Sequence, residues 1–452
     1  MSDCTGNPKK RPAPRKKPAS PCCGGKEPAA KPASPCCGGK EPAAKPASPC
    51  CGGKEPAAKP ASPCCGGGAS PAAAGDPQAW FANMIPNAIA YAREQKAAGR
   101  PIVGIMCEYT PREIILAAGA VPVCLCGGAV ETIPPAEEHL PANLCPLIKS
   151  TYGYHVTGAN PLLEMCDLLV AETTCDGKKK MYELLADTRE MIVLELPHRA
   201  EDPAALARWT QELHRLRSAL ERRFGVGITD CRLREAIASM NEERHLRRDL
   251  AALMKRDAPP LTGRGLLDYR SVISAIPADI AHYAAAVERL SAAEGCASLA
   301  SRTRVLLTGV PVVHGAERVL DVIEGAGGLI VCQETCTGLR PILEDVDERA
   351  ANPVAAIAEK YYHLPCSVMS RNTARLDSLR RLAREYRAEC VIDLIWQACL
   401  TYDVESHYVR RLAAEMNLPY LRIETDYSPS DSARMAVRVE ALLETVRGAA
   451  AR

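Results

Sequence analysis

Aromatic side chains and long apolar runs are scarce in this sequence of 452 residues. Aromatic residues make up 4% of the chain, and no stretch of eighteen consecutive apolar residues occurs, so a membrane-spanning helix is not expected. The first residues, MSDCTGNPKKRPAPRKK, contain no apolar segment of the kind found in a secretory signal. These absences favour a cytoplasmic protein with no membrane partner.

Nucleotide-binding motifs are also absent. No G-x-x-x-x-G-K-[ST] motif occurs, so the chain is not expected to hydrolyse nucleotide through a P-loop, and no G-x-G-x-x-G motif follows a predicted strand. The net charge of +2 hides an asymmetry, because residues 1–75 carry 12 Lys and Arg against 4 Asp and Glu, whereas residues 76–452 carry 44 against 50. The mildly acidic body argues against a nucleic-acid partner.

Cysteine, in contrast, is abundant. The 22 cysteines in a chain without a secretory signal indicate a reducing compartment and metal or redox chemistry, and argue against a disulfide framework. Eight of them form Cys-Cys pairs in residues 1–75, where PASPCCGGKEPAAK repeats with a period of 14. This segment contains no aromatic residue, Val, Ile or Leu, so it is predicted to be disordered. The pairs are interpreted either as metal ligands or as part of a low-complexity extension.

Short apolar runs alternate with helical patterns in residues 76–452. Because this alternation is typical of parallel sheets, the sequence predicts an α/β fold of two doubly wound (Rossmann-like) parallel-sheet domains, at 76–201 and 302–452. The charged residues 202–301 are predicted to form a helical segment between them. Strands are expected at 102–106, 121–125, 167–172, 191–196, 304–308, 328–332, 390–395 and 420–423, and helices at 111–118, 314–324 and 430–447.

Six cysteines follow predicted strands or lie in loops, three in each half. In open parallel sheets, ligands bind beyond the carboxyl ends of the strands, so these thiols are expected to face a binding region. Soft thiolates converging from several loops are typical ligands of an iron–sulfur cluster or of zinc. Two triplets imply either two small sites or one large site between the halves. The six are Cys107, Cys145 and Cys175 in the first half and Cys336, Cys366 and Cys399 in the second.

The other cysteines of the body are interpreted mostly as packing residues, since free cysteine is often buried. Cys332, four residues before Cys336, is an alternative to it as a ligand. Two cysteines in the helical segment are expected to be small buried residues. The packing set comprises Cys124, Cys126, Cys166 and Cys390, together with Cys231 and Cys296 of the helical segment.

Several ionisable residues near the six cysteines are candidates for catalytic proton transfer. The carboxylates among them are equally well explained by helix capping or by ion pairs with Arg112 or Lys178. The run Lys178-Lys179-Lys180 is interpreted either as a balance for the charge of a metal site or, preferably, as a solvated face. The candidates are Glu108, Glu113, His155 and Glu334, with Glu172 as a further flanking carboxylate.

Three segments carry a family resemblance: CEYTPREIILAAGAVPVCLCGG, TTCDGKKK, and LLTGVP with the later IEGAGGLIVCQETCTG. Together they resemble the 2-hydroxyacyl-CoA dehydratase and benzoyl-CoA reductase superfamily, and most closely its double-cubane-cluster anaerobic reductases. The Cys-x-Tyr-x-Pro-x-Glu pattern of the resemblance stands at Cys107, Tyr109, Pro111 and Glu113. The resemblance extends from about Trp80 to the C-terminus.

The resemblance implies an oxygen-sensitive iron–sulfur enzyme that receives low-potential electrons from a separate ATP-hydrolysing activator with its own [4Fe–4S] cluster. The dehydratase branch holds one [4Fe–4S] cluster through three cysteines. The double-cubane branch is a homodimer that holds an [8Fe–9S] cluster, two cubanes sharing a bridging sulfide. Two cysteine triplets in one chain fit the second branch, with each half expected to hold one cubane.

The expected function is therefore ATP-dependent reduction of a small substrate, with all six cysteines as iron ligands. The first alternative is a 2-hydroxyacyl-CoA dehydratase subunit with a single [4Fe–4S] cluster. The second alternative, suggested by the Cys-rich repeats, is a metal-storage or cluster-delivery protein.

Overall fold

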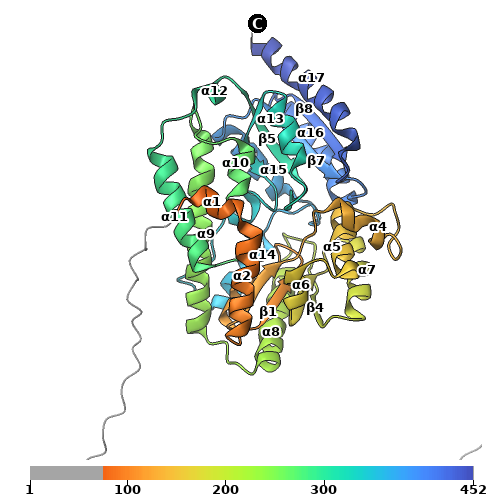
Figure 1. Cartoon of the computed structure of the whole chain (residues 1–452), viewed down its shortest axis with the longest axis vertical. Coiled ribbons are helices and arrows are strands. Elements are labelled where there is room, and N and C mark those ends of the chain that lie inside the picture. Colours follow the sequence, from red (N-terminus) through yellow and green to blue (C-terminus); the bar gives the residue numbers. More distant parts are fainter. Residues whose placement is uncertain (1–74, 451–452) are drawn as a thin grey trace, which may run out of the picture. The chain divides into compact units, whose positions relative to one another are not determined.

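The computed structural model describes residues 75–450, so the repeats that were predicted to be disordered lie outside the described residues. The body contains two four-stranded sheets in which all paired strands are parallel, and helices cover them. The predicted α/β fold class is confirmed for this body. Figure 1 shows the sheet of β1 and β4 in the lower part of the body and the sheet of β5, β7 and β8 in the upper part.

The first half builds a sheet with the strand order β2-β1-β3-β4. Its strands are β1 (Ile102–Ile105), β2 (Val121–Cys124), β3 (Leu168–Glu172) and β4 (Met191–Leu194). Its helices are α1 (Pro77–Ala82), α2 (Met84–Ala97), α3 (Arg112–Ala117), η1 (Val130–Thr132), α4 (Ile133–Ala136), α5 (Pro146–Thr157), α6 (Pro161–Met165) and α7 (Asp176–Ala186).

The second half repeats the same connectivity, with the strand order β6-β5-β7-β8. Its strands are β5 (Thr303–Gly309), β6 (Gly328–Glu334), β7 (Cys390–Trp396) and β8 (Tyr420–Thr425). Its helices are α13 (Arg318–Gly325), η3 (Arg340–Ile342), α14 (Pro353–Tyr362), α15 (Thr373–Glu385), α16 (Leu400–Glu415), η4 (Pro429–Asp431) and α17 (Ser432–Ala450). The shared strand order supports two related halves.

One predicted boundary is wrong. A helix was expected from residue 314, but α13 begins at Arg318. Glu317 explains the late start, because its carboxylate accepts a hydrogen bond from the Gly315 amide at 2.9 Å and pairs with Arg270. A loop that holds this ion pair therefore occupies residues 314–317.

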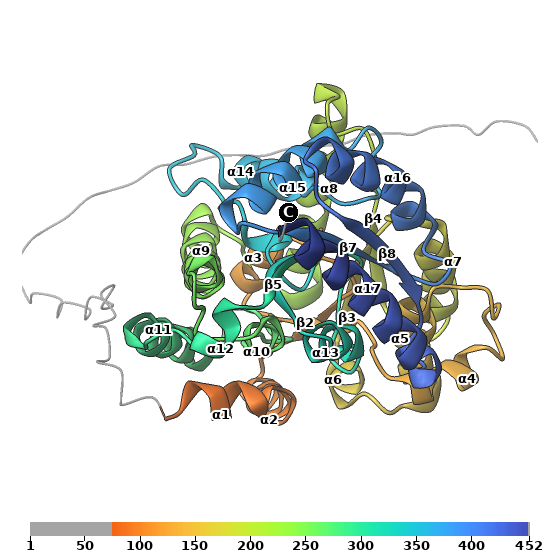
Figure 2. The same ribbon diagram turned by 90° about the horizontal axis from the view of Figure 1, so that it is seen from above.

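Helices lie on both faces of each sheet, which is why its strands are apolar almost throughout. In β5, Val305 and Leu307 pack into one core with residues of α13 and α17, while Leu306 packs into another with residues of α15 and α16. In the view of Figure 2, β7 and β8 lie between α16 and α17. The sheet of the second half is therefore doubly wound.

The helical segment joins the two halves. It contains α8 (Pro203–Phe224), α9 (Asp230–Ala252), η2 (Leu253–Lys255), α10 (Gly263–Asp268), α11 (Pro277–Ala292) and α12 (Ala297–Ala300). Helix α9 packs against α3 of the first half and α14 of the second. Ile114 of α3 and Ile357 of α14 lie in one core with Trp209 of α8. The halves thus share a core, as residues of the second half complete the packing of the first.

Two further observations concern the described residues. No helix within residues 75–450 combines the length and the apolar character needed to cross a membrane.

Cys231 and Cys296, which were expected to be buried, are exposed. Cys231 lies in the first turn of α9 and Cys296 directly precedes α12, so both are at helix starts on the surface and not on the buried faces.

Candidate functional site

Five of the six cysteines lie where the chain leaves a strand or enters a helix, and the sixth lies in a loop. Cys107 follows β1 and Cys336 follows β6, whereas Cys366 lies in the loop between α14 and α15. The other three occupy the N-cap positions of α5, α7 and α16, and they are Cys145, Cys175 and Cys399.

Three of these thiols form what we call the Cys107 group: Cys107, Cys336 and Cys366. Hydrogen bonding between the Cys336 and Cys366 thiols lowers the pKa of Cys366, and Cys107 opposes this electrostatically. Together they line a small internal void of about 10 Å³. The Tyr402 hydroxyl lies between two of them, 4.0 Å from Cys336 Sγ and 3.9 Å from Cys366 Sγ.

The remaining thiols form the Cys145 group: Cys145, Cys175 and Cys399. Hydrogen bonding between the Cys145 and Cys399 thiols lowers the pKa of Cys145, while Cys175 opposes this electrostatically and is itself affected by Cys399. Because each of the three is a helix N-cap, the positive ends of three helix dipoles meet at this group. The helix dipoles favour a cofactor with negative charge at this position, although burial raises the pKa of Cys175 in its absence.

The contacts within each group cross between the halves. Cys107 of the first half meets Cys336 and Cys366 of the second, and Cys399 of the second half meets Cys145 and Cys175 of the first. The sequence suggested that the three cysteines of each half would form one group, but in the structure each group combines cysteines from both halves. All six thiols belong to a region built by both halves.

Lys178 connects the two groups. Burial alone would lower its pKa, but Cys107, Cys175 and neighbouring groups hold the pKa well above its usual range. Its ammonium group donates a hydrogen bond to the Met106 carbonyl at 2.7 Å. The preferred interpretation of a solvated face is therefore wrong for Lys178. It holds only for the other two lysines of the run, since Lys179 pairs with Asp176 and Lys180 with Glu183.

A buried ionic network supports the Cys107 group. Arg340 donates a hydrogen bond to Cys336 Sγ at 3.2 Å and another to the Tyr402 hydroxyl. Its guanidinium also pairs with Glu334, which in turn pairs with Arg375 at 3.3 Å. Burial alone would raise the pKa of Glu334, but Arg340 and Arg375 hold it below its usual range. The carboxylate is ionised and fixes both guanidinium groups.

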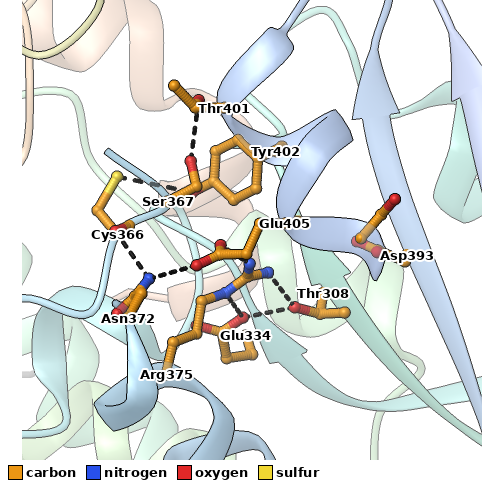
Figure 3. Close-up of polar contacts among 12 residues, drawn as sticks. Thr308, Glu334, Cys366, Ser367, Asn372, Arg375, Asp393, Thr401, Tyr402 and Glu405 are labelled. Atoms are coloured by element: carbon orange, nitrogen blue, oxygen red, sulfur yellow. Dashed lines mark hydrogen bonds and ion pairs between the residues drawn. The ribbon is translucent and has the colours of Figure 1, made fainter. Parts of the chain in front are cut away.

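The same network holds the loop of Cys366, as Figure 3 shows. Asn372 donates hydrogen bonds to the Cys366 carbonyl and to Glu405, both at 2.8 Å. Glu405 pairs with Arg375, which connects this loop to Glu334. The backbone of Cys366 is thus connected to Glu334, which ends β6 just before Cys336.

The Cys-x-Tyr-x-Pro-x-Glu pattern has a structural role at each of its positions. The Tyr109 hydroxyl donates to the Leu364 carbonyl at 2.9 Å, which joins the loops of Cys107 and Cys366. Pro111 is the N-cap of α3, and Glu113 pairs with buried Arg244 of α9. The pattern therefore anchors Cys107 both to the second half and to the helical segment.

The candidate proton-transfer residues occupy different places. Glu108 lies beside Cys107 and pairs with Arg112 at 2.9 Å. Glu113 and Glu334 are buried in the ion pairs described above. His155 lies on α5, where its Nε2 is 3.2 Å from the Thr188 hydroxyl. Of these four candidates, Glu108 is thus the one that lines the void of the Cys107 group.

Glu172, the fifth candidate, is fully buried at the end of β3. Burial raises its pKa to about 7, while a hydrogen bond from Thr110 opposes the rise. Its second carboxylate oxygen has no hydrogen-bond partner among the described residues. Glu172 is therefore a carboxyl that can hold a proton near neutral pH.

Two other cysteines, Cys332 and Cys126, clarify the ligand set. Cys332 is buried in the core of β6 with Leu382 and Tyr386, so it packs away from both groups. Cys126, interpreted from the sequence as a packing residue, lies near Cys107 and Lys178 and donates to the Met106 carbonyl at 3.6 Å. The sequence analysis did not identify Cys126 as a neighbour of the site, because its spacing in the sequence is the same as that of a buried cysteine in a strand.

A larger cavity of about 330 Å³ lies beside the Cys107 group. Glu108, Cys336 and Pro341 border both this cavity and the small void between the thiols. A molecule in the cavity therefore has access to Cys336 and to the Glu108 carboxylate.

Comparison with protein families agrees with this geometry. The family described as "2-hydroxyglutaryl-CoA dehydratase, D-component" matches residues 107–446, from the first cysteine of the site almost to the C-terminus. The chain belongs to this dehydratase family. The match includes all six cysteines of the site.

Curated relatives of this D-component family member carry dehydratase and reductase names. The "Putative dehydratase subunit YjiM" of Escherichia coli (strain K12) is 41% identical over 77% of this chain and 92% of its own length. The (R)-phenyllactyl-CoA dehydratase beta subunit of Clostridium sporogenes is 23% identical over 81% of the chain and 97% of its own. A benzoyl-CoA reductase subunit of Thauera aromatica is 30% identical over 37% of the chain and 44% of its own. The chain thus resembles enzyme subunits of both classes.

The donor set of this family member suits an iron–sulfur cluster. Within residues 75–450, no three His, Cys, Asp or Glu side chains surround one point closely enough to hold a single metal ion. In a cubane, each thiolate binds a different iron, so its ligands lie farther apart than those of one zinc ion. Burial raises the pKa of Cys107 to about 12, so its free thiol is protonated. Binding to iron would replace that proton and remove the cost of a buried thiolate.

Proposed function

We propose that this protein is an iron–sulfur anaerobic reductase that holds an [8Fe–9S] double-cubane cluster through six cysteines and receives electrons from a separate ATP-hydrolysing activator. The observation that supports the proposal is that two groups of three thiols, each with members from both halves, both lie within electrostatic reach of the buried Lys178. A single cubane takes at most four thiolates, so six in one region favour a larger cluster. The ligands would be Cys107, Cys145, Cys175, Cys336, Cys366 and Cys399.

A cluster bound there would supply low-potential electrons to a small substrate. The residues around it set the conditions for that chemistry. Lys178, the hydrogen bond from Arg340 and three helix N-termini place positive charge around the thiols. Such charge and hydrogen bonding stabilise the reduced, more negative state of an iron–sulfur site.

Glu108 is the residue best placed to move a proton. Its carboxylate borders the 330 Å³ cavity and the void between the thiols, and Arg112 holds it at 2.9 Å. Reduction of a small molecule consumes protons as well as electrons, so a carboxyl group at the cavity wall can deliver them. The resemblance to double-cubane reductases further favours a homodimer in the cytoplasm.

A 2-hydroxyacyl-CoA dehydratase subunit with one [4Fe–4S] cluster is the second candidate, favoured by the names of several relatives. In that case Cys107, Cys145 and Cys175 alone would hold the iron. The two candidates differ in the iron content of the chain. They also differ in whether a second, different subunit is needed for turnover.

Iron and sulfide analysis after oxygen-free purification tests the proposal. We expect about eight irons per chain for a bridged pair of cubanes and about four for a single one. Electron paramagnetic resonance before and after reduction checks the number of clusters. Because the sequence has no P-loop motif, the isolated protein should hydrolyse no ATP, and ATP-driven reduction should require the activator. Four irons per chain, or ATP hydrolysis by the isolated chain, would contradict the proposal.

A further inference from the structure

The 330 Å³ cavity beside the Cys107 group has a strongly cationic wall. The wall is also partly apolar, because side chains such as Ile89, Met240 and Val313 contribute to it. Its two carboxylates, Glu108 and Glu243, face five cationic side chains. These are Arg112, Arg244, Arg247, Arg270 and Lys360.

Three of these cations have carboxylate partners close by. Arg112 pairs with Glu108 in the wall, and two others pair with carboxylates behind it. Those pairs are Arg244 with Glu113 and Arg270 with Glu317. Arg247 and Lys360 remain as the cations with the poorest partners.

Lys360 is buried without a counter-ion. Its ammonium group donates one hydrogen bond, to the Pro341 carbonyl at 2.9 Å, and lies 4.3 Å from the centre of the Tyr361 ring. Within residues 75–450, no carboxylate is within ion-pair distance of it. Burial first, and then Arg244 and Arg112, lower the pKa of Lys360 well below its usual range, although the more distant carboxylates Glu113 and Glu108 oppose this. An anion in the cavity would supply the missing partner and favour the charged form.

Arg247 is held only weakly. Its one hydrogen bond within the described part of the chain goes to Glu243 at a long 3.4 Å. The other oxygen of Glu243 accepts from the Ala275 amide at 2.7 Å. The guanidinium therefore keeps free donors, and its planar fork matches the two oxygens of a carboxylate.

We infer that this cavity binds a small organic carboxylate as the substrate, with the carboxylate at the Lys360 and Arg247 side and the carbon skeleton along the apolar wall. Lys360 contacts the Pro341 carbonyl, and Pro341 borders the void between the thiols, so the bound carboxylate would lie beside the Cys107 group. The volume is near the lower limit of small-molecule sites. The inference rests on the proposed reductase function, since it names the substrate class for the same site.

Calorimetric titration of the full-length protein, purified without oxygen, tests this assignment. The probes are acetate, crotonate, succinate and benzoate, each with its neutral amide, and crotonyl-CoA as a thioester. We expect at least one free carboxylate to bind, and its amide to bind at least about tenfold more weakly, since a charge-assisted hydrogen bond contributes about 1.5–3 kcal/mol. Equal affinity for acid and amide, preference for the thioester, or no binding of any of the four acids would overturn the inference.

Variants locate the carboxylate within the cavity. Lys360→Met and Arg247→Met should each weaken binding of the best acid by about tenfold or more, while leaving binding of the amide unchanged. Lys360→Arg should restore part of the affinity. Arg434→Met, at a side chain that is 77% exposed on α17, is the matched control and should change nothing. Unchanged affinity in both cavity variants would refute the placement.

Failure of the inference is distinguishable from failure of the proposed function. Iron and sulfide content report on the six cysteines and do not depend on what occupies the cavity. If the protein holds about eight irons but binds no carboxylate, the proposed cluster is supported and the proposed substrate class is wrong. If the protein binds carboxylates but holds about four irons, the substrate class is supported and the double-cubane cluster is wrong.

Discussion

At the scale of single residues, Glu334 is the charge on which the surroundings of Cys336 depend. It is fully buried, and its two oxygens accept hydrogen bonds from Arg340, Arg375 and Thr308. Removing one member of a buried ionic network leaves the remaining charges without compensation. Arg340 would then lose the group that holds it against Cys336 Sγ.

We therefore expect Glu334→Gln to lower the free energy of unfolding by about 3–5 kcal/mol. Urea unfolding of the iron-free protein measures the effect. Asp377→Asn is the control, because this carboxylate is 74% exposed and pairs with Arg380 on the surface of α15. The control should cost no more than about 1 kcal/mol. Equal losses in the two variants would show that the network contributes little.

Asp393 gives a prediction for pH. It is buried in β7, where burial raises its pKa to about 6, while Arg375 and a hydrogen bond from Tyr420 oppose the rise. The folded state therefore binds the proton more tightly than the unfolded state, whose carboxyl has a pKa of 3.8. The contribution of Asp393 to stability should fall as pH rises from about 4 to about 6, by about 3 kcal/mol at 1.36 kcal/mol per unit.

Asp393→Asn removes this titration and can keep the contact with Tyr420. Relative to the native protein, the variant should gain about 2 kcal/mol in unfolding free energy when the pH is raised from 4.5 to 7. Urea unfolding at both pH values measures the gain. A difference between the two proteins that stays constant with pH would contradict the assigned pKa.

Residue identity alone predicted some of the site. Four of the six cysteines stood out because they follow predicted strands, and the carboxyl ends of parallel strands meet at one edge, whereas Cys145 and Cys366 were chosen from loops. The partners of these cysteines did not stand out. Lys178 was grouped with two surface lysines, and Arg340 carried no signal, because ion pairs between distant segments depend on tertiary packing. A buried lysine such as Lys360 cannot be told from a surface lysine by sequence.

At the scale of elements, three helices begin at cysteines of the site. In α5, α7 and α16, the N-cap cysteine makes no side-chain capping hydrogen bond to the backbone. Cysteine is a poor substitute for Ser, Thr, Asp or Asn at this position. Cysteine at these three positions therefore makes the helices less stable than a better N-cap residue would. Such a cost is easier to explain if the cysteines are metal ligands than if they are packing residues.

Replacing each N-cap cysteine by serine separates the two roles. Cys145→Ser, Cys175→Ser and Cys399→Ser should each leave the stability of the iron-free protein unchanged or raise it by about 0.5–1 kcal/mol, since serine caps well. The same variants should lose iron when purified without oxygen. Thermal unfolding and iron analysis measure the two effects. Reduced stability with unchanged iron content would identify these cysteines as packing residues.

The eight strands were predicted to within two residues of their ends, because most of them are short apolar runs, and the central strands β1, β3, β5 and β7 are buried almost throughout. The errors occur where a tertiary contact sets the boundary. Residues 314–317 have the pattern of a helix start, yet Glu317 uses its carboxylate for Arg270 and for the Gly315 amide. Local sequence patterns contain no information about such a distant partner.

At the scale of the whole molecule, the common strand order of the two sheets brings the thiols of both halves together. Cys107 after β1 meets Cys336 after β6, and Cys175 after β3 lies near Cys399 after β7. A site held by the first half alone would have no need of thiols from the second. The crossing contacts therefore favour one shared cluster over a single cubane in the first half.

Two alanine variants of β6 and its loop decide between these arrangements. Cys336 lies in the Cys107 group, whereas Cys332, four residues earlier, packs into the core with Leu382. We expect Cys336→Ala to lose a large part of about eight irons per chain and to change the paramagnetic resonance spectrum, because a thiolate ligand is removed. Cys332→Ala should keep the native iron content, and urea unfolding of both iron-free variants checks that neither change disrupts the fold. A single cubane held by the first half would leave both variants at about four irons per chain, and the dehydratase function would then replace the reductase.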